Sequence, residues 1–160
     1  MASSRLVPFV ILLAGIGVIG GALLFQFVGG LQPCELCYYE RWPWYAAIVL
    51  ALAVLASGRR DAAWWLAVAG AILFLGGGAL SFYHVGVEQH WFAGPTACSG
   101  PTAAADSLEA LKAQILGQKP VRCDEVQWSL LGVSLAGWNL VASAALLVFC
   151  LGALHRRRAA

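Results

Sequence analysis

Long apolar runs constrain this chain most, because a bilayer core about 30 Å thick requires roughly 20 consecutive apolar residues in a helix. Residues 7–28 and 62–83 reach that length, and the second of these runs carries no charge. Residues 129–154 also qualify, whereas the run 42–56 reaches full length only when extended back towards the cysteines that precede it. The pattern predicts four membrane-spanning helices, at about 7–28, 36–57, 62–83 and 129–154.

Composition supports a membrane protein. The chain is 61% hydrophobic and 11% charged, whereas an ordinary soluble domain carries about 45–50% apolar and about 25% charged residues. This excludes a soluble globular enzyme and a disordered tail, and a net charge of +2 gives no reason to expect nucleic acid as a partner. We expect all 160 residues to form one integral-membrane domain, an all-α four-helix transmembrane bundle.

Basic residues predict the orientation, because cytoplasmic loops are enriched in Lys and Arg. Six of the ten basic residues fall at one end of the expected bundle: Arg5, Arg59, Arg60, Arg156, Arg157 and Arg158. The opposite end holds the other four basic residues, Arg41, Lys112, Lys119 and Arg122. Seven of the eight acidic residues also lie at that end. Both termini are therefore expected in the cytoplasm, with external loops at about 29–35 and 84–128.

Within the expected helices, small and polar residues stand out. Gly17 and Gly21 form a pair that would let another helix approach closely, although glycine is also simply frequent in membrane helices. Gln26 is the one strongly polar residue of the first apolar run, and Asn139 is the most polar of the last.

Four of the five cysteines fall in the two external loops. Cys34 and Cys37 lie in the first loop, and Cys98 and Cys123 lie in the second. In a bacterium-like cell this face meets the oxidising compartment, where disulfides persist. Cys150 lies inside the fourth expected helix and is expected to be a small buried hydrophobe.

The spacing Cys34-x-x-Cys37 is that of dithiol redox motifs. Cys37 is expected near the start of the second helix, where the positive end of the helix dipole favours its thiolate. Arg41 follows one turn later on the same face, where its guanidinium could stabilise a thiolate or a bound anion. Extension of Arg41 to the membrane interface is the structural alternative.

The residues alone leave three classes open for the cysteines. Redox catalysis fits the short pair, and two structural disulfides are possible, although closing a four-residue ring gains little loop entropy. A zinc site could use four cysteines, but the usual second short-spaced pair is missing, since Cys98 and Cys123 stand far apart. We predict no metal site.

The second loop contains one predicted element. Asp106 and Glu109 form the start of a capping box, and apolar residues then recur at helical spacing until Gly117. Few polar residues face its wet side. A short helix lying on the membrane surface is therefore predicted.

Several motifs point to one family. Residues Cys34–Arg41 read CELCYYER, and the chain also offers Tyr83–His84 at the end of the third expected helix, two cysteines in the second loop, and Gln127–Trp128 and Leu131–Gly132 entering the fourth. Over nearly its whole length the chain thus resembles the disulfide-bond formation protein B (DsbB) family of bacterial inner-membrane oxidoreductases. The resemblance implies an inner-membrane protein with periplasmic redox loops.

For the cysteines, the resemblance implies a relay. A periplasmic thioredoxin-fold oxidase of the DsbA type would attack Cys98 and form a mixed disulfide. Cys123 would then be released and attack Cys34, leaving Cys37 as a thiolate.

For the electrons, the resemblance implies transfer to a quinone dissolved in the bilayer, ubiquinone or menaquinone. Cys37 would lie beside the quinone, Arg41 would stabilise the developing negative charge, and His84 would donate a hydrogen bond to a quinone carbonyl.

Two rival functions remain. Vitamin K epoxide reductases also use a membrane-boundary CxxC with two loop cysteines, but their CxxC follows the loop pair, whereas here it comes first. A membrane scaffold or transporter subunit with structural disulfides would need the cysteines for stability alone.

Overall fold

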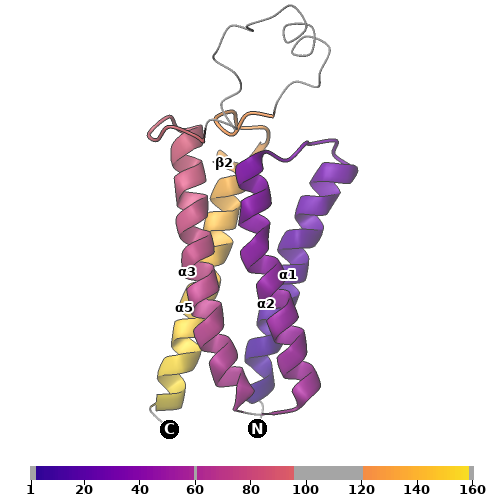
Figure 1. Ribbon diagram of the computed structural model, residues 1–160, viewed down its shortest axis with the longest axis vertical. Coiled ribbons are helices and arrows are strands. Elements are labelled where there is room, and N and C mark those ends of the chain that lie inside the picture. Colours follow the sequence, from indigo (N-terminus) through magenta and orange to yellow (C-terminus); the bar gives the residue numbers. More distant parts are fainter. Residues whose placement is uncertain (1–2, 60, 96–120, 159–160) are drawn as a thin grey trace, which may run out of the picture.

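The computed structural model describes residues 3–59, 61–95 and 121–158 and arranges them as a helical bundle (Figure 1). These residues form four helices, α1 (Ser3–Phe27), α2 (Glu35–Ser57), α3 (Ala62–Glu88) and α5 (Leu135–Arg158). A short antiparallel ribbon of β1 (Ser129–Leu130) and β2 (Val133–Ser134) precedes α5. The helices confirm the predicted class, and the ribbon is an addition to it. The predicted surface helix after Asp106 and the residue Cys98 lie outside the described residues.

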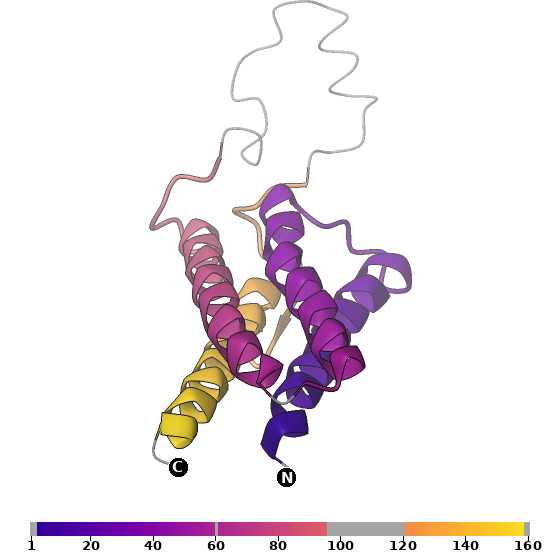
Figure 2. The same cartoon turned by 60° about the horizontal axis from the view of Figure 1, so that its bottom comes forward.

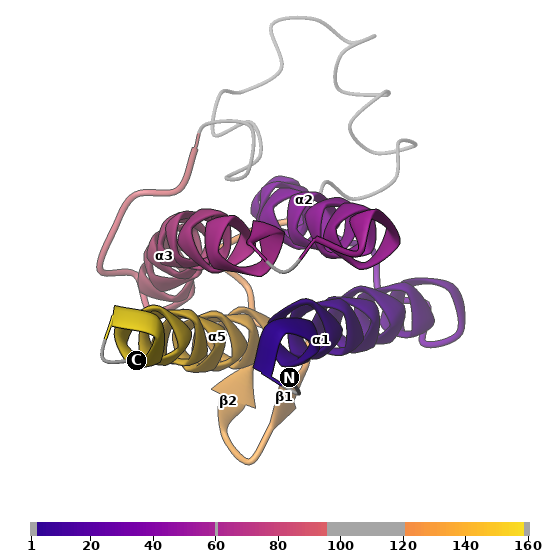
Figure 3. The ribbon, with the colours of Figure 1, turned by 90° about the horizontal axis from the view of Figure 1, so that it is seen from below.

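The helices pack in two layers. Seen from below, α2 lies beside α3, and α5 lies beside α1 (Figure 3). Packing is most extensive between α3 and α5 and between α1 and α2, whereas α1 and α5 touch little. Figures 1 and 2 show that α1 begins and α5 ends at the same end of the bundle, where α2 also connects to α3. The α1–α2 connection, which carries the first cysteine pair, lies at the opposite end.

The outward-facing surface of the helices is apolar, as expected of a surface in contact with lipid. Three helical segments are long and apolar enough to cross a membrane: Arg5–Phe27, Ala62–Glu88 and Leu135–Arg156. Large apolar side chains point outwards along all four helices, such as Leu24, Val49, Ile72 and Val148, each more than 60% exposed. Because soluble monomers rarely expose contiguous apolar surfaces of this extent, the fold fits lipid as its solvent.

A core of small and aromatic side chains holds the layers together. Trp44 and Phe74 are 1% exposed, and their ring centroids lie 5.1 Å apart. Gly70 lies where three helices meet, and a Cβ added to it would lie 3.0 Å from Cys150 Sγ and 3.3 Å from Ile11 Cδ1. Cys150 itself is fully buried in this core, as predicted for a small hydrophobe.

The third helix is longer than predicted. It was expected to end at Tyr83 but continues to Glu88, so that His84 is a helical residue with a buried side chain. Packing explains the extension, because Val87 is buried and the Gly86 carbonyl accepts the amide hydrogens of Trp91 and Phe92 as the chain leaves the helix. The prediction ended the helix where the apolar run meets its first polar residue. In the structure, the helix ends where its packing against the rest of the protein ends.

The fourth predicted helix starts six residues late, at Leu135 rather than Ser129. Leu131 and Gly132 both have positive φ angles, 55° and 79°, and form the tight turn that pairs Ser129 with Ser134. The Ser134 hydroxyl then accepts the amide hydrogen of Gly137 and caps the new helix. Turn chemistry therefore overrides the apolar run here. The other two helices match their predicted ranges within about four residues.

Replacing Gly70 by Val should destabilise the bundle by about 1–3 kcal/mol, because the added methyl groups enter a filled core. Gly76→Val in the same helix is the matched control, since a Cβ there has no neighbour within 4 Å. Thermal unfolding in detergent measures both. Equal midpoints for the two variants would contradict the packing described here.

Candidate active site

The first two cysteines form the start of α2. Cys34 is the N-cap, with φ −73° and ψ 173°, and its Sγ accepts the amide hydrogen of Cys37 at 3.2 Å. The two Sγ atoms lie 2.8 Å apart. Cys34 is buried, Cys37 is partly exposed, and both are free thiols. The CxxC spacing thus brings both sulfur atoms together at a helix N-terminus, as the sequence predicted.

The electrostatic benefit of that N-terminus falls on Cys34 rather than on Cys37. The hydrogen bond with the Cys37 thiol, helped by the Cys37 amide, lowers the pKa of Cys34 below the ordinary value of a cysteine, against the opposing effect of burial. The sequence predicted this stabilisation for Cys37. The difference arises because an N-cap side chain receives the free amide hydrogens of the first turn directly.

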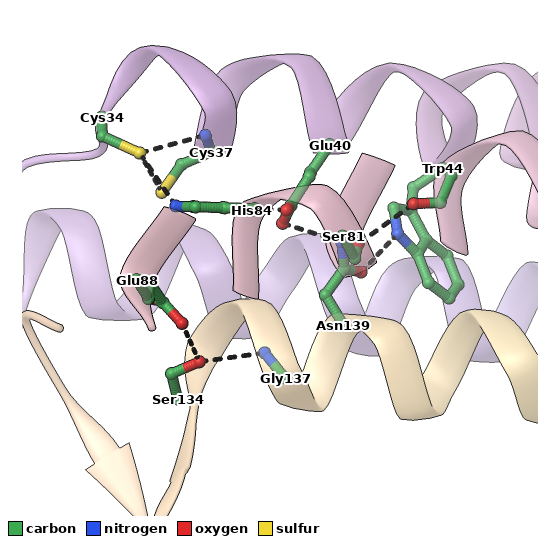
Figure 4. Close-up of polar contacts among 11 residues, drawn as sticks. Cys34, Cys37, Glu40, Trp44, Ser81, His84, Glu88, Ser134, Gly137 and Asn139 are labelled. Atoms are coloured by element: carbon green, nitrogen blue, oxygen red, sulfur yellow. Dashed lines mark hydrogen bonds and ion pairs between the residues drawn. The ribbon is translucent and has the colours of Figure 1, made fainter. Parts of the chain in front are cut away.

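His84 brings α3 to the same cysteines. Its Nε2 lies 3.6 Å from Cys34 Sγ, and its Nδ1 lies 2.9 Å from Glu40 Oε1 (Figure 4). His84 and Glu40 are 3% and 6% exposed, so the pair is shielded from solvent. An ionised carboxylate only accepts hydrogen bonds. Nδ1 is therefore the nitrogen that donates to Glu40, and Nε2 is the nitrogen that faces the sulfur atoms.

Asn139 of α5 completes the support for Glu40. Its amide nitrogen donates to Glu40 Oε2 and to Ser81 Oγ, both at 2.9 Å. Its amide oxygen accepts the indole hydrogen of Trp44 at 2.8 Å, and Ser81 in turn donates to the Gly77 carbonyl at 3.0 Å. Because Trp44 can only donate, it fixes which way the amide faces. Glu40 is thus held by groups from two other helices.

Sequence reasoning passed over Glu40, Ser81 and Asn139 as site residues. Asn139 did carry a signal, because polar residues inside membrane spans are rare and face the interior of a bundle. Glu40 belongs to the motif CELCYYER but was not assigned a role of its own. Ser81 gave no usable signal, since serine is common in helices that pack closely in membranes.

Arg41 lies near the cysteines but has other partners. Its guanidinium donates to Gln26 Oε1 of α1 at 2.8 Å and lies 5.1 Å from the centroid of the Tyr38 ring. Gln26, the polar residue of the first apolar run, therefore holds the Arg41 side chain in place. The side chain is positioned between α1 and α2 and lines the same cavity as Cys37 and His84.

The second cysteine pair is described only in part. Cys123 is 1% exposed and belongs to one buried cluster with Cys34, Leu36 and Val87, against which Cys37 also packs. Cys123 is engaged in a disulfide. Cys34 and Cys123 are 89 positions apart in the chain, and the fold brings them into one cluster.

A cavity of about 260 Å³ opens beside these residues. Its lining combines polar residues, among them Cys34, Cys37, Arg41, His84 and Glu88, with small and apolar residues of α1 and α5, including Gly17, Gly21, Ala22, Leu135 and Ala136. A Cβ at Gly17 or Gly21 would meet nothing within 4 Å. The close helix approach considered for these glycines is therefore absent, and they border open space instead.

The chemistry available here is that of sulfur. Cys34 and Cys37 are close enough to exchange between dithiol and disulfide, with a third cysteine in the same cluster. The partly apolar cavity could hold a small electron acceptor beside Cys37, Arg41 and His84, which all line it. The ligand atoms of Cys34, Cys37 and His84 also lie within 4.8 Å of one another, which is the spacing of a metal-binding group.

The chain is similar to known disulfide bond formation proteins. The family model for "Disulfide bond formation protein DsbB" matches residues 4–153. A "Disulfide bond formation protein B" of Verminephrobacter eiseniae is 34% identical over 162 residues, which cover 95% of this chain and 86% of that protein. The protein of the same name from Hahella chejuensis is 32% identical over 150 residues, covering 88% and 87% respectively. No solved structure matches the chain significantly.

Replacing Cys37 by Ala should raise the pKa of Cys34, because it removes the thiol that contributes most to stabilising the Cys34 thiolate. Alkylation of Cys34 in the reduced protein should then require a higher pH than in the unsubstituted protein. Mass spectrometry of the Cys34 peptide across a pH series measures the shift. Cys150→Ala is the control, and a profile unchanged by Cys37→Ala would contradict this description.

Proposed function

The chain belongs to the DsbB family of disulfide bond formation proteins, and from this premise we propose that it reoxidises a periplasmic DsbA-type oxidase and passes the electrons to a membrane quinone. Family membership and three membrane-span-like helices make it an integral membrane disulfide oxidoreductase. The partner, the electron acceptor, the residue roles and the orientation are the content of the proposal.

One observation carries the proposal: a CxxC pair, a third cysteine and a cavity meet at the same end of the bundle. Cys34 and Cys123 share one buried cluster, and Cys37 lines the cavity. A soluble dithiol needs access to a loop cysteine, whereas a lipid-soluble acceptor needs access from the bilayer. This end of the bundle offers both routes of access, because the loops and the boundary between α1 and α5 meet there.

The sulfur steps are exchanges of thiolates and disulfides. A partner thiolate attacks Cys98 and forms a mixed disulfide with it, the Cys98–Cys123 disulfide breaks, and Cys123 leaves as a thiolate. Cys123 then attacks Cys34 of the oxidised CxxC pair, and Cys37 leaves as a thiolate. Each step forms one S–S bond and breaks one, so no electrons are lost until the pair meets its acceptor.

The described geometry explains why Cys37 would carry the charge at that stage. In the dithiol, the favourable hydrogen bonds act on Cys34. Once Cys34 is bonded to Cys123, it has no charge to stabilise, and Cys37 is the sulfur left facing the cavity.

The cavity residues fit a quinone. The apolar walls suit a ring and an isoprenoid chain, and Arg41 and His84 supply polar groups at the end nearest the sulfur atoms. A bound quinone would supply a two-electron acceptor of higher potential than the partner. Arg41, held by Gln26, provides a fixed positive charge there, and His84 is oriented by Glu40. The lining does not discriminate ubiquinone from menaquinone.

The proposed location is the bacterial inner membrane, with four spans, both termini in the cytoplasm and the cysteine loops in the periplasm. The Arg-rich α2–α3 connection and the end of α5 lie together at one end of the bundle, which supports the orientation expected from charge. The fourth span would be α2, whose first half carries Glu35, Glu40 and Arg41 but whose second half exposes Val49, Leu50 and Leu52.

Anaerobic mixing of the purified protein with a short-chain quinone and a reduced periplasmic DsbA-type dithiol tests the proposal. We expect the quinone to be reduced stoichiometrically, and Cys37→Ser to abolish this reaction. Cys150→Ser is the matched control and should leave the rate unchanged, because Cys150 lies in the apolar core. If the quinone is reduced equally by variants that lack each external cysteine, the protein is a scaffold with structural disulfides or reacts by another route.

Gly21→Leu should impair use of long-chain quinones, because the new side chain would occupy the cavity beside the cysteines. We expect KM to rise about tenfold, equivalent to about 1.4 kcal/mol of binding free energy. Gly20→Leu is the matched control, since Gly20 has equally open surroundings but does not line the cavity. Equal kinetics for the two variants with a long-chain quinone would place its binding elsewhere.

A further inference from the structure

Three potential metal ligands converge from two helices at the mouth of the cavity. Sγ of Cys34 and of Cys37 belong to the first turn of α2, and Nε2 of His84 comes from α3 (Figure 4). All three atoms lie within 4.8 Å of one another. Two thiolates and one imidazole are a ligand set that zinc uses in proteins.

The distances are close to those of a tetrahedral zinc site. With Zn–S of about 2.3 Å and Zn–N of about 2.0–2.1 Å, tetrahedral angles put a sulfur and a nitrogen ligand about 3.6 Å apart and two sulfur ligands about 3.8 Å apart. Cys34 Sγ and His84 Nε2 already lie 3.6 Å apart. The two Sγ atoms, at 2.8 Å, need to separate by about 1 Å, which a rotation of the partly exposed Cys37 side chain can supply.

The histidine is also prepared as a ligand on its far side. Metal-binding histidines usually donate their other ring N–H to a carboxylate, which fixes the tautomer and orients the ring. His84 Nδ1 lies 2.9 Å from Glu40 Oε1, and Glu40 is itself held by Asn139. In the neutral imidazole this arrangement leaves Nε2, with its lone pair, facing the sulfur atoms.

Charge and access are compatible with a divalent cation. Two thiolates neutralise a divalent ion, so that the bound cluster adds no net charge to a poorly solvated region. All three ligands line the cavity, which leaves room for water as a fourth ligand. Zinc sites with three protein ligands keep their fourth position for water or substrate.

We propose that the dithiol form of this protein binds one zinc-class divalent cation through Cys34, Cys37 and His84, with Glu40 as the residue that orients His84. Binding releases the two thiol protons and forms two metal–sulfur bonds without any change of oxidation state. The disulfide form offers no thiolate and does not bind. The ion therefore holds the pair reduced and blocks its thiol–disulfide exchange.

Binding does not depend on the proposed quinone reaction, so the test reads the metal directly. Full-length reduced protein in detergent is titrated anaerobically with Co²⁺, with Cys98 and Cys123 replaced by Ser to remove the loop thiols. We expect one equivalent to bind with a thiolate-to-cobalt charge-transfer band and intense tetrahedral d–d bands, and Zn²⁺ to displace it. The same polypeptide oxidised to the Cys34–Cys37 disulfide should give no such bands.

Variants identify the ligands and the orienting residue. Cys37→Ser should remove the charge-transfer intensity of one thiolate, and His84→Ala should weaken binding strongly. Glu40→Gln should weaken binding about 10–100-fold while leaving the tetrahedral spectrum in place. His90→Ala is the matched control, because His90 is exposed and contacts the Glu88 carbonyl. Its affinity for Co²⁺ should equal that of the unsubstituted protein.

Three outcomes would overturn the proposal. The first is equal cobalt binding by the dithiol and the disulfide. The second is a weak octahedral spectrum, which would indicate oxygen ligands elsewhere. The third is an affinity unchanged by His84→Ala. The comparison of dithiol with disulfide uses one polypeptide, so it decides the question even if Cys37→Ser or His84→Ala fails to fold.

Discussion

The structure depends on one buried interaction, the contact between Glu40 and His84. Both residues lie in largely apolar helices that suit a lipid environment. An unpaired polar group in such an environment costs several kcal/mol. Neither can be satisfied within its own helix. Glu40 therefore requires His84 from α3 and Asn139 from α5, and Asn139 requires Trp44 and Ser81 in turn. Because an apolar environment offers no water as an alternative partner, these bonds fix the relative rotation of three helices in a way that apolar contacts between similar side chains could not.

The same contact connects packing to chemistry. Glu40 and Cys37 are three residues apart on α2, so the helix that carries the carboxylate also carries the cysteines. His84 uses one ring nitrogen for the carboxylate and turns the other towards Cys34. A change in the rotation of α2 against α3 would therefore alter the histidine–sulfur distance at once. The cysteine pair lies at the start of α2, and the Glu40–His84 contact holds the same helix one turn further along. The functional groups are therefore held by rigid surroundings, as a precise site requires.

How much of this could be read from the sequence differs between the elements. The four helices of the described residues, and their approximate ranges, followed from hydropathy, because lipid imposes a length on apolar runs that water does not. The ends did not follow: Leu131 and Gly132 make a tight turn inside an apolar run, and α3 continues beyond His84 because Val87 packs against the cysteine cluster. For the site, motif spacing found Cys34 and Cys37 and their common helix start. It assigned the helix-terminus effect to the wrong one of the two, because spacing does not reveal which residue is the N-cap. Asn139, Ser81 and Gln26 are partners across helices, and such pairings depend on helix rotation, which one sequence does not specify.

Gly17 and Gly21 show how the same residues can serve opposite purposes. Small residues on a membrane helix usually allow a second helix to approach, and α1 would then pack against α5 along this face. Here α1 packs mainly on α2, and the glycine face is left beside the cavity. Two constraints select this outcome. Arg41 bonds to Gln26 and ties the upper part of α1 to α2, while the Glu40–His84–Asn139 contacts tie α5 to the α2–α3 layer. Helices α1 and α5 are thus each committed to other partners, and the space between them stays open at the depth of the cysteines. A polar network that stabilises three helices consequently also keeps open the cavity that Cys34 and Cys37 line.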